Sequence, residues 1–387
     1  MYRNTYVKID NEILKSNVKE IINYYNNYKY YIGVVKANAY GHGDYIINDL
    51  IKGGINYLAV SSLEEAISIR KYNQDIKILC LEPINLEHIN TILENNITIT
   101  IESLDYTKEL LKKELPNKLN IHIKIDTGMN RLGYTNKSVL EETIYLINKN
   151  KNTYLEGIYT HLATSGINDI YYDKQINKFK YLTKDIDLSK IPIIHLNRSI
   201  TLAHHEKLPF ETGTRLGIMM YGFNQSLNEP KGLRKIKRNL LNKIKGISPT
   251  ILKNNLNLKT AYSLYTEVMN IKHIKKGEFV GYGANYIAKE DTIIATLPIG
   301  YADGMNKLMK YVVINNQKYP IIGDICMDMT TIKIDNSIKL YDKVEIFGKS
   351  ISIKTVANNM NTNAYHILTS ITNRVPRIYK NNKEIKY

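Results

Sequence analysis

Short runs of β-branched and apolar residues alternate with helical patterns through the first half of the chain, and this alternation restricts the fold more than any other feature. Eight candidate strands follow one another: Tyr31–Val35, Tyr57–Ser61, Ile76–Leu81, Ile97–Ile101, Leu119–Ile125, Leu155–Thr160, Ile191–Leu196 and a short one near Thr212–Arg215. Amphipathic stretches lie between them, as at Ile13–Tyr25, Leu63–Tyr72, Leu86–Asn95 and Ser138–Ile147. The pattern predicts an α/β fold, a TIM-type (β/α)8 barrel.

Beyond about residue 225 the β-rich runs continue without long helices between them. They are Tyr262–Asn270, Thr292–Leu297, Tyr311–Ile314, Met329–Ile334, Lys343–Phe347 and one near Arg377–Tyr379, with short helices expected at Ile353–Met360 and Ala364–Ile371. This predicts a C-terminal, mainly antiparallel β domain. The expected domains are a barrel over 1–225, a basic connecting segment over 226–262 and a β-rich domain over 263–387, with the alternative that residues 1–10 pair with the C-terminal domain.

The composition excludes several classes of protein. The formal charge of +16 comes from lysines scattered along the chain, which indicates a solvated surface rather than a nucleic-acid site. Cys80 and Cys326 are far apart, so we expect neither a disulfide scaffold nor a metal site. No apolar stretch has the length of a signal peptide or a bilayer span, so we expect a cytoplasmic protein without a nucleic-acid or membrane partner.

One segment departs from this even distribution of charge. Its cations are Lys231, Arg234, Lys235, Lys237, Arg238, Lys243 and Lys245. Its apolar residues recur at near-helical spacing and are Leu233, Ile236, Leu240, Leu241 and Ile244. The segment is predicted to form a basic amphipathic helix on the surface.

A lysine stands directly after the first predicted strand, in the run from Val35 to Gly43. Because functional groups of such barrels lie at the carboxyl ends of the strands, the Lys36 ammonium is expected at the barrel mouth. A buried lysine there can lose its proton and form a Schiff base, the linkage that pyridoxal 5'-phosphate (PLP) requires. A structural lysine whose ammonium reaches solvent is the alternative.

Motifs across nearly the whole chain resemble those of alanine racemases. Val-Val-Lys-Ala-Asn-Ala-Tyr-Gly-His-Gly, around Lys36, looks like the PLP-lysine motif of that family. The other matching motifs, in order, are Lys124 to Gly133, Tyr159 to His161, Thr214 to Gly222, Val280 to Ala284, Pro298 to Gly304, Gly323 to Asp328 and Arg374 to Arg377. Each motif alone is weak, but this many in order identify the chain as a member of this PLP-dependent family of fold type III.

The resemblance implies PLP as cofactor, held covalently by Lys36. It also implies a set of residues around the cofactor phosphate, namely Tyr40, Ser199, Gly217, Ile218 and Tyr365. Hydroxyls and backbone N–H groups are suitable donors for a phosphate dianion. By the same resemblance Arg215 faces the pyridine nitrogen, where a guanidinium can only donate a hydrogen bond and keeps the nitrogen unprotonated. An ion pair between strands is the structural alternative for Arg215.

Arg131 and Lys124 are placed together by the family pattern. Arg131 lies near the phenolic oxygen of the cofactor and the substrate carboxylate, and its planar guanidinium suits both. Lys124 is expected to point into the barrel, because His122, Lys124 and Asp126 share one face of a strand. Some relatives carry a carbamylated lysine at this position, and pairing of Lys124 with Asp126 is the alternative.

Tyr282 is the second catalytic base by resemblance, with His161 hydrogen-bonded to its phenol. The phenol pKa, ordinarily near ~10, must be lowered by surrounding cations or donors such as Lys36, Arg215 and His161. The family solution is a homodimer in which each site takes residues from the partner. These are Tyr282, Tyr301, Met327 and Asp328, with the Met327 N–H directed at the substrate carboxylate.

The sequence also departs from the family. Arg198 precedes Ser199 where the family usually has Ala-Asn, Asp324 stands where a basic residue is common, and the basic segment at 231–245 is longer than usual. The function that the resemblance implies is interconversion of L- and D-alanine for peptidoglycan precursors. The alternatives are a serine or broad-spectrum racemase and, in a different class, a non-catalytic PLP-homeostasis protein. The latter lacks the β domain, and a basic amino-acid decarboxylase would show a cysteine-and-aspartate motif absent from this chain.

Overall fold

A computed structural model describes residues 3–163, 167–224, 232–244, 247–249, 254–381 and 384–386. The chain forms two compact units. The β unit contains Met1–Ile13, Asn38–Ile46 and Thr260–Tyr387. The barrel unit contains Leu14–Ala37 and Ile47–Lys259. Part of the predicted connecting segment, including Lys231 and Lys245, lies outside the described residues.

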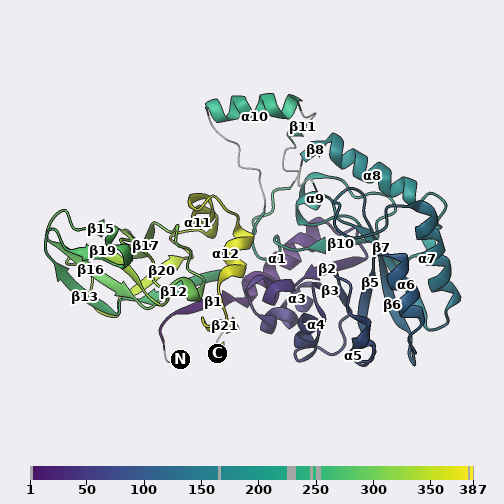
Figure 1. The fold of residues 1–387 in the computed structure, drawn as a ribbon, viewed down its shortest axis with the longest axis horizontal. Helices are drawn as coiled ribbons and strands as arrows, with labels where there is room; N and C mark the ends of the chain where they lie inside the picture. The colour runs from purple at the N-terminus through teal and green to yellow at the C-terminus, as the bar shows by residue number, and fades with distance from the viewer. Residues whose placement is uncertain are drawn as a thin grey trace. The chain divides into compact units, whose positions relative to one another are not determined.

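Eight parallel strands form the sheet of the barrel unit, in the order β10-β2-β3-β4-β5-β6-β7-β9 (Figure 1). Their bounds are β2 Tyr30–Val34, β3 Tyr57–Val60, β4 Ile78–Cys80, β5 Ile97–Ile101, β6 Leu119–Ile125, β7 Thr153–Thr160, β9 Ile193–His195 and β10 Gly213–Leu216. The two ends of the sheet meet through a parallel bridge between Arg198 and Arg215. The result is a nearly closed barrel, and the predicted barrel class is confirmed.

Helices alternate with these strands (Figure 1). They are α1 Asn11–Tyr24, α2 Lys36–Tyr40, α3 Ile47–Gly53, α4 Leu63–Arg70, α5 Ile89–Glu94, α6 Leu104–Leu111, α7 Lys137–Lys149, α8 Ile170–Leu182 and α9 Ser199–His204, with 3-10 turns at Asp44–Ile46, Leu86–His88 and Leu188–Lys190. Side chains cap several helix starts, since Ser62, Ser103 and Asn136 accept backbone N–H groups of the first turn. Strand β5 is buried along its whole length because its two faces meet the barrel interior and the helices.

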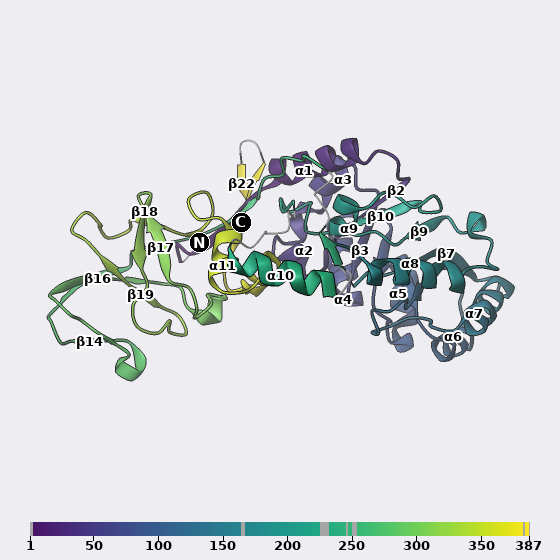
Figure 2. The ribbon, with the colours of Figure 1, turned by 90° about the horizontal axis from the view of Figure 1, so that it is seen from above.

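The β unit is built from a seven-stranded sheet, a three-stranded sheet and a two-stranded ribbon. The first has the order β18-β17-β20-β12-β1-β21-β22, the second β13-β16-β19 and the third β14-β15. Figure 2 labels strands of all three, among them β17 and β18, β16 and β19, and β14. The bounds are β1 Tyr6–Asp10, β12 Tyr262–Glu267, β13 Asn270–Ile274, β14 Phe279–Val280, β15 Tyr286–Ile287, β16 Thr292–Leu297, β17 Tyr311–Ile314, β18 Gln317–Pro320, β19 Thr330–Ile334, β20 Lys343–Phe347, β21 Arg377–Asn381 and β22 Glu384–Lys386, with helices α11 Ile353–Asn359 and α12 Ala364–Ser370. Most pairings are antiparallel, which confirms the predicted C-terminal architecture.

Two details of this unit differ from a simple reading of the sequence. The predicted strand Tyr262–Asn270 is wrong as a single element, because it divides into β12 and β13, which belong to different sheets. Between them, Val268 donates to the Asp342 carbonyl and Met269 to the Thr296 carbonyl, so the chain changes partners there. The N-terminal strand β1 lies between β12, antiparallel, and β21, parallel.

The basic segment forms helix α10, Leu233–Ile244, followed by the short strand β11, Ile247–Pro249. Strand β11 pairs antiparallel with β8, Ile167–Asp169. No helix in the described part of the chain has both the length and the apolarity to cross a membrane. Within the same described ranges, no three His, Cys, Asp or Glu side chains gather as metal ligands.

Candidate active site

The turn that carries Lys36 has a left-handed backbone. Four consecutive residues, Ala37 to Tyr40, have φ between 50° and 54°. A left-handed conformation costs roughly 1–2 kcal/mol for each L-residue, so the surroundings must hold this turn. The Ala37 N–H donates to Glu65 Oε1 at 2.7 Å, and the Gly43 N–H donates to the Asn38 carbonyl at 2.9 Å. Lys36 follows β2 after one intervening residue, Val35, and is half-buried, less enclosed than the sequence predicted.

Tyr40 and Tyr365 come together in the β unit. Their ring centroids lie 5.8 Å apart with an interplanar angle of 48°. Tyr365 is in the first turn of α12, whose N-cap Asn363 accepts the His366 N–H at 3.1 Å. Two of the five predicted phosphate-binding residues are therefore neighbours.

The other three lie at the ends of β9 and β10 in the barrel unit. The Gly217 N–H donates to the Ser199 hydroxyl oxygen at 2.8 Å, and both residues are buried. Ile218 follows Gly217 and is fully buried. This hydroxyl and these backbone groups provide the donor chemistry that a phosphate requires.

Arg215 lies in the barrel interior and donates only to neutral acceptors in its four recorded bonds. Its Nη1 donates to His195 Nδ1 at 2.7 Å and to the His195 carbonyl at 2.5 Å. Its Nη2 donates to the carbonyls of Thr160 at 2.8 Å and Leu196 at 3.0 Å. Burial, followed by the charge of Arg198, lowers the pKa of Arg215 to about 10, so it remains a cation at neutral pH. The Nε–H takes no part in these four bonds.

A buried polar chain continues from Arg215 and was missed by the sequence analysis. Because arginine can only donate, His195 Nδ1 must accept, and the proton of the neutral ring is on Nε2. His195 Nε2 then donates to His122 Nδ1 at 3.0 Å. His122 Nε2 in turn faces Glu156 Oε2 at 3.4 Å. The contacts thus run from Arg215 to a carboxylate, and the last of them is a 3.4 Å approach of His122 Nε2 to Glu156 rather than a hydrogen bond.

Glu156 anchors this chain at its other end. Its Oε2 accepts the Tyr57 hydroxyl at 2.7 Å, and its Oε1 pairs with the Lys77 ammonium, which is half exposed. Burial would raise the pKa of Glu156, but the contacts with His122, Lys77 and Tyr57 outweigh it and lower the pKa to about 2. Burial has the opposite effect on the pKa of His122, which it lowers, and this imidazole is therefore neutral at pH 7.

A strand irregularity brings Glu156 to the barrel interior. Ile121 pairs with Leu155 and His122 with Gly157, so Glu156 has no partner on β6. Such a bulge redirects a side chain that simple alternation would place on the other face. A Cβ on Gly157 would lie 2.5 Å from His122 Cε1, so only glycine leaves room for the imidazole ring.

Lys124 is buried, as expected for a residue that points into the barrel. Its Nζ lies 5.7 Å from the ring centroid of Tyr159, which also contacts the Arg215 guanidinium at 5.4 Å. Burial, followed by the charges of Arg131 and Arg215, lowers the pKa of Lys124 to about 8.

Asp126 is not the partner of Lys124. Its carboxylate accepts the backbone N–H groups of Gly128 at 2.8 Å, Asn130 at 3.0 Å and Arg131 at 2.8 Å. These bonds shape the turn that carries Arg131, whose side chain is exposed.

His161 is a neutral group rather than the cation that the sequence analysis allowed. Burial, followed by the charges of Arg215 and Arg198, lowers the pKa of His161 to about 2. It can therefore orient a phenol by hydrogen bonding but cannot lower a phenol pKa by its charge. Arg198, the departure noted before Ser199, contributes its charge here.

The predicted residues of the β unit lie on exposed turns. Tyr282 is 73% exposed and stands between Gly281 and Gly283, both with positive φ. Tyr301 and Met327 are also exposed and belong to adjacent loops, since the Tyr301 N–H donates to the Cys326 carbonyl at 3.0 Å.

Asp324 joins the loops of Tyr282 and Met327. The Asn285 amide donates to Asp324 Oδ2 at 2.9 Å. A Cβ on Gly281 would lie 3.4 Å from the Asp324 backbone nitrogen, so the two loops are close along their backbones as well. The departure at position 324 thus has a structural role.

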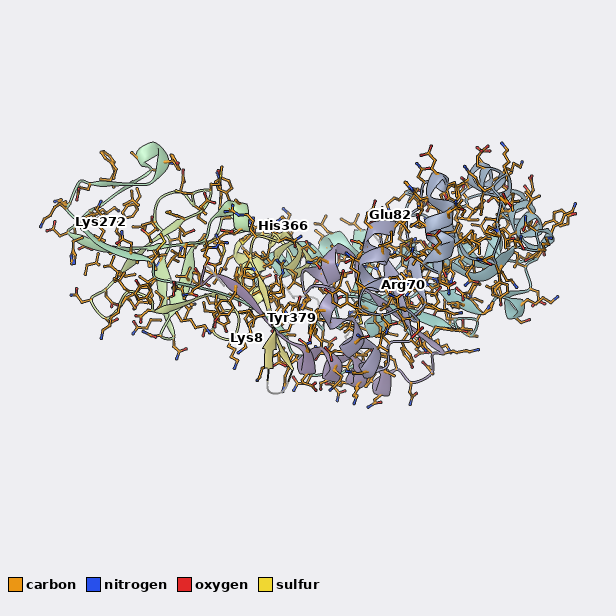
Figure 3. The ribbon with its side chains drawn as sticks, turned by 90° about the horizontal axis from the view of Figure 1, so that it is seen from below. Lys8, Arg70, Glu82, Lys272, His366 and Tyr379 are labelled. Atoms are coloured by element: carbon orange, nitrogen blue, oxygen red, sulfur yellow. The ribbon has the colours of Figure 1, made fainter. Side chains whose placement is uncertain are left out.

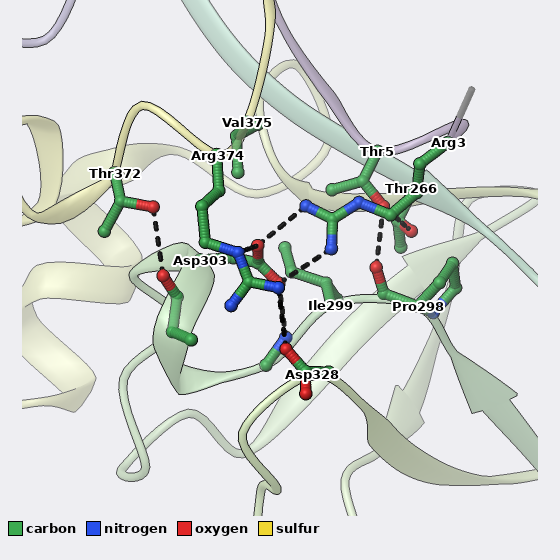
Figure 4. Close-up of polar contacts among 12 residues, drawn as sticks. Arg3, Thr5, Thr266, Pro298, Ile299, Asp303, Asp328, Thr372, Arg374 and Val375 are labelled. Atoms are coloured by element: carbon green, nitrogen blue, oxygen red, sulfur yellow. Dashed lines mark hydrogen bonds and ion pairs between the residues drawn. The ribbon is translucent and has the colours of Figure 1, made fainter. Parts of the chain in front are cut away.

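Asp328 is paired with a cation of its own unit (Figure 4). Arg374 Nη2 donates to Asp328 Oδ1 at 2.7 Å, and Arg374 Nε lies 3.7 Å from Asp303 Oδ1. Arg3 binds the same buried Asp303 through two bonds, at 2.7 and 3.3 Å. Asp303 also accepts the Gly300 N–H at 3.0 Å, so these charges fix the turn of Tyr301.

Comparisons with known proteins identify the family of the chain. The family described as "Alanine racemase, N-terminal domain" matches residues 9–225, and "Alanine racemase, C-terminal domain" matches residues 261–379. Alanine racemase 1 of Clostridium acetobutylicum is 36% identical over 371 residues, which cover 92% of this chain and 90% of that protein. The crystal structure of alanine racemase from Bacillus anthracis with bound L-Ala-P is 30% identical with a TM-score of 0.87, and covers 100% of this chain and 97% of that one.

A structure of histidine racemase from Leuconostoc mesenteroides is 25% identical with a TM-score of 0.84, and covers 98% of this chain and 99% of that one. The fold therefore hosts more than one substrate. Both family domains are nevertheless matched in order along this sequence, and the chain belongs to the alanine racemase family.

Proposed function

We propose that this chain is an alanine racemase, a PLP-dependent isomerase that interconverts L-alanine and D-alanine. The observation that carries the proposal is the match to both family domains, supported by a buried Arg215 whose recorded partners are all neutral. A carboxylate partner would favour a protonated cofactor ring, whereas this arginine can only donate.

The residues present fit PLP. The Ser199 hydroxyl, the backbone of Gly217 and Ile218, and the hydroxyls of Tyr40 and Tyr365 would hold its phosphate. Lys36 would hold its aldehyde carbon, and Arg215 its ring nitrogen. When bound, PLP withdraws electrons from the α-carbon of an amino acid and makes its hydrogen acidic.

Two bases on opposite faces of the α-carbon would move that proton. We assign the D-face to Lys36 and the L-face to Tyr282. A neutral His161 would orient the Tyr282 phenol, leaving Lys36 and Arg215 as the cations that lower its pKa. Arg131 and the Met327 N–H would bind the substrate carboxylate, and Tyr301 and Asp328 would complete the substrate-binding residues. Lys124 is a candidate for carbamylation, because a pKa of about 8 leaves a fraction of its amine neutral.

The active species in this proposal is a homodimer with shared sites. The exposed turns that carry Tyr282, Tyr301 and Met327 support it, because large side chains at functional positions are exposed in the single chain. Each site would combine Lys36 of one subunit with Tyr282 of the other. We also propose the division into a barrel domain at 1–225, whose residues 1–10 pair with the C-terminal domain, a connecting segment at 226–262 and a β domain at 263–387. A cytoplasmic location and a role in supplying D-alanine for peptidoglycan complete the proposal.

A chiral assay of the PLP-loaded protein on L-alanine, L-serine and L-histidine tests the function. We expect D-alanine to form fastest, and preferential turnover of serine or histidine would replace the proposed substrate. Borohydride reduction and peptide mapping test the attachment site separately. A pyridoxyl group on any lysine other than Lys36 would contradict the assignment.

A further inference from the structure

Helix α10 presents an apolar face that the described chain leaves open. Five aliphatic side chains of this 12-residue helix are between 44% and 84% exposed: Leu233, Ile236, Leu240, Leu241 and Ile244. Their spacing of three and four residues places them along one side. Soluble proteins rarely expose so many contiguous aliphatic side chains without a partner.

The rest of this helix is cationic. Its sequence, Leu-Arg-Lys-Ile-Lys-Arg-Asn-Leu-Leu-Asn-Lys-Ile, contains five basic residues and no acidic one. Of these, Lys237 and Lys243 are exposed. The net charge of the chain, +16, has the same sign.

We propose that α10 binds the surface of an anionic lipid bilayer, with its aliphatic face inserted among the acyl chains near the headgroups. At about 1.5 Å per residue the helix is roughly 18 Å long, too short to span a bilayer but suitable for lying in its interface. The exposed Lys237 and Lys243 would meet anionic headgroups at the inserted face or its border, each strengthening binding roughly fivefold. This departs from the sequence expectation of no membrane partner, and it concerns attachment to a surface rather than a span.

Charge and apolarity together favour lipid over other occupants. A second copy of the helix would bring two cationic surfaces together without a compensating acid. A nucleic acid would use the cations but would leave the five aliphatic side chains without a role. The proposal is independent of the racemase function, because α10 contains none of the residues assigned to the active site.

The absence of tryptophan from the chain allows a site-specific test. Leu240→Trp introduces a single indole on the aliphatic face of α10. Leu308→Trp is the matched control, since Leu240 and Leu308 are 61% and 60% exposed. With phosphatidylcholine vesicles containing phosphatidylglycerol, the fluorescence of Leu240→Trp should shift to the blue and that of Leu308→Trp should not. An unshifted Leu240→Trp spectrum would overturn the proposal.

Vesicle sedimentation of the full chain tests the two components separately. Lys237→Gln with Lys243→Gln should weaken binding at least tenfold, and Ile236→Asn with Leu240→Asn should do the same although every charge remains. Lys272→Gln with Lys276→Gln, exposed lysines of the β unit, are the matched charge control (Figure 3 labels Lys272). Vesicle binding that persists in the Ile236→Asn, Leu240→Asn variant would contradict insertion into lipid. So would self-association of the unsubstituted chain in the absence of vesicles, if the same variant abolishes it.

Discussion

The Arg215 guanidinium donates to Nδ1 of His195 at 2.7 Å, and this bond fixes the direction of the hydrogen bonds behind it. Because Arg215 cannot accept, the protons of His195 and His122 are both assigned to Nε2, and the chain ends on Glu156. A surface ion pair at Lys77 is thereby connected with the group proposed to face the cofactor nitrogen.

Glu156→Gln should disturb both histidines. The variant removes the anion that ends the chain, so we expect the free energy of unfolding to fall by about 2–3 kcal/mol. The ¹⁵N resonances of His122, and through it those of His195, should also change, because His122 Nε2–H no longer faces an anion although Arg215 still fixes both tautomers. Glu109→Gln, which breaks the exposed pair with Lys112, is the control and should leave the free energy of unfolding nearly unchanged. Unchanged histidine resonances in Glu156→Gln would refute the directed chain.

Stability should fall as the pH drops from 7 to 5. Burial lowers the pKa of His42 to about 3, well below its unfolded value of 6.5. As the pH falls, the unfolded chain therefore binds a proton at this histidine before the folded chain does. The contribution of neutral His42 to the free energy of unfolding is complete above pH 6.5. It is lost as the pH falls toward 3, at up to about 1.4 kcal/mol per pH unit. His161 acts in the same direction, and Glu156 adds a loss between pH 4.5 and 2.

Urea unfolding at pH 7, 6 and 5 measures this dependence. His42→Gln should reduce the dependence of the unfolding free energy on pH by up to the binding of one proton. An identical slope in the wild type and His42→Gln would show that His42 is not protonated on unfolding.

The strand periodicity was sufficient to predict the barrel and to place Lys36 and Arg215 at strand ends. It could not predict the buried polar chain, because His122, Glu156 and His195 come from three strands. The bulge that directs Glu156 inward also depends on pairing with β6, which alternation along one strand does not contain. The neutrality of His161 arises from burial and neighbouring cations that assemble only in the fold.

Gly41→Ala should destabilise the protein far more than a glycine substitution on an open turn. A Cβ at Gly41 would lie 2.2 Å from the Leu368 carbonyl oxygen, and its φ is +78°. We expect a loss of at least about 3 kcal/mol, from left-handed strain and displaced backbone. Gly277, with φ +91° and nothing within 4 Å, is the control, and Gly277→Ala should lose about 1–2 kcal/mol. The free energy of unfolding in urea measures both losses. Equal losses for Gly41→Ala and Gly277→Ala would show that the close approach of Gly41 to the Leu368 carbonyl adds nothing to the cost of the substitution.

Tyr282→Phe should nearly abolish racemisation in both directions, because a positioned base contributes roughly 10²–10⁴-fold. Lys36 should still exchange the α-proton of D-alanine with deuterium oxide, which proton NMR measures. Exchange of the L-alanine α-proton at the wild-type rate would exclude Tyr282 as the L-face base.

Mixed dimers should recover activity from two inactive parents. Lys36→Ala and Tyr282→Phe chains, once exchanged, would form one intact site in each heterodimer. The measurement is racemase activity after mixing, with subunit exchange verified by mass spectrometry of the intact complexes. No recovery despite exchange would place both bases within one chain.

The position of β1 in the seven-stranded sheet also determines how late during synthesis this sheet can form. Its antiparallel neighbour β12 begins roughly 250 residues further along the chain, and β21 comes later still. At about 5–20 residues per second, β1 is synthesised on the order of 10–50 s before either partner strand exists. Apart from the pairing of β2 with β10, the barrel strands pair with neighbours nearby in sequence, so β1 is made early and is among the last strands to be paired.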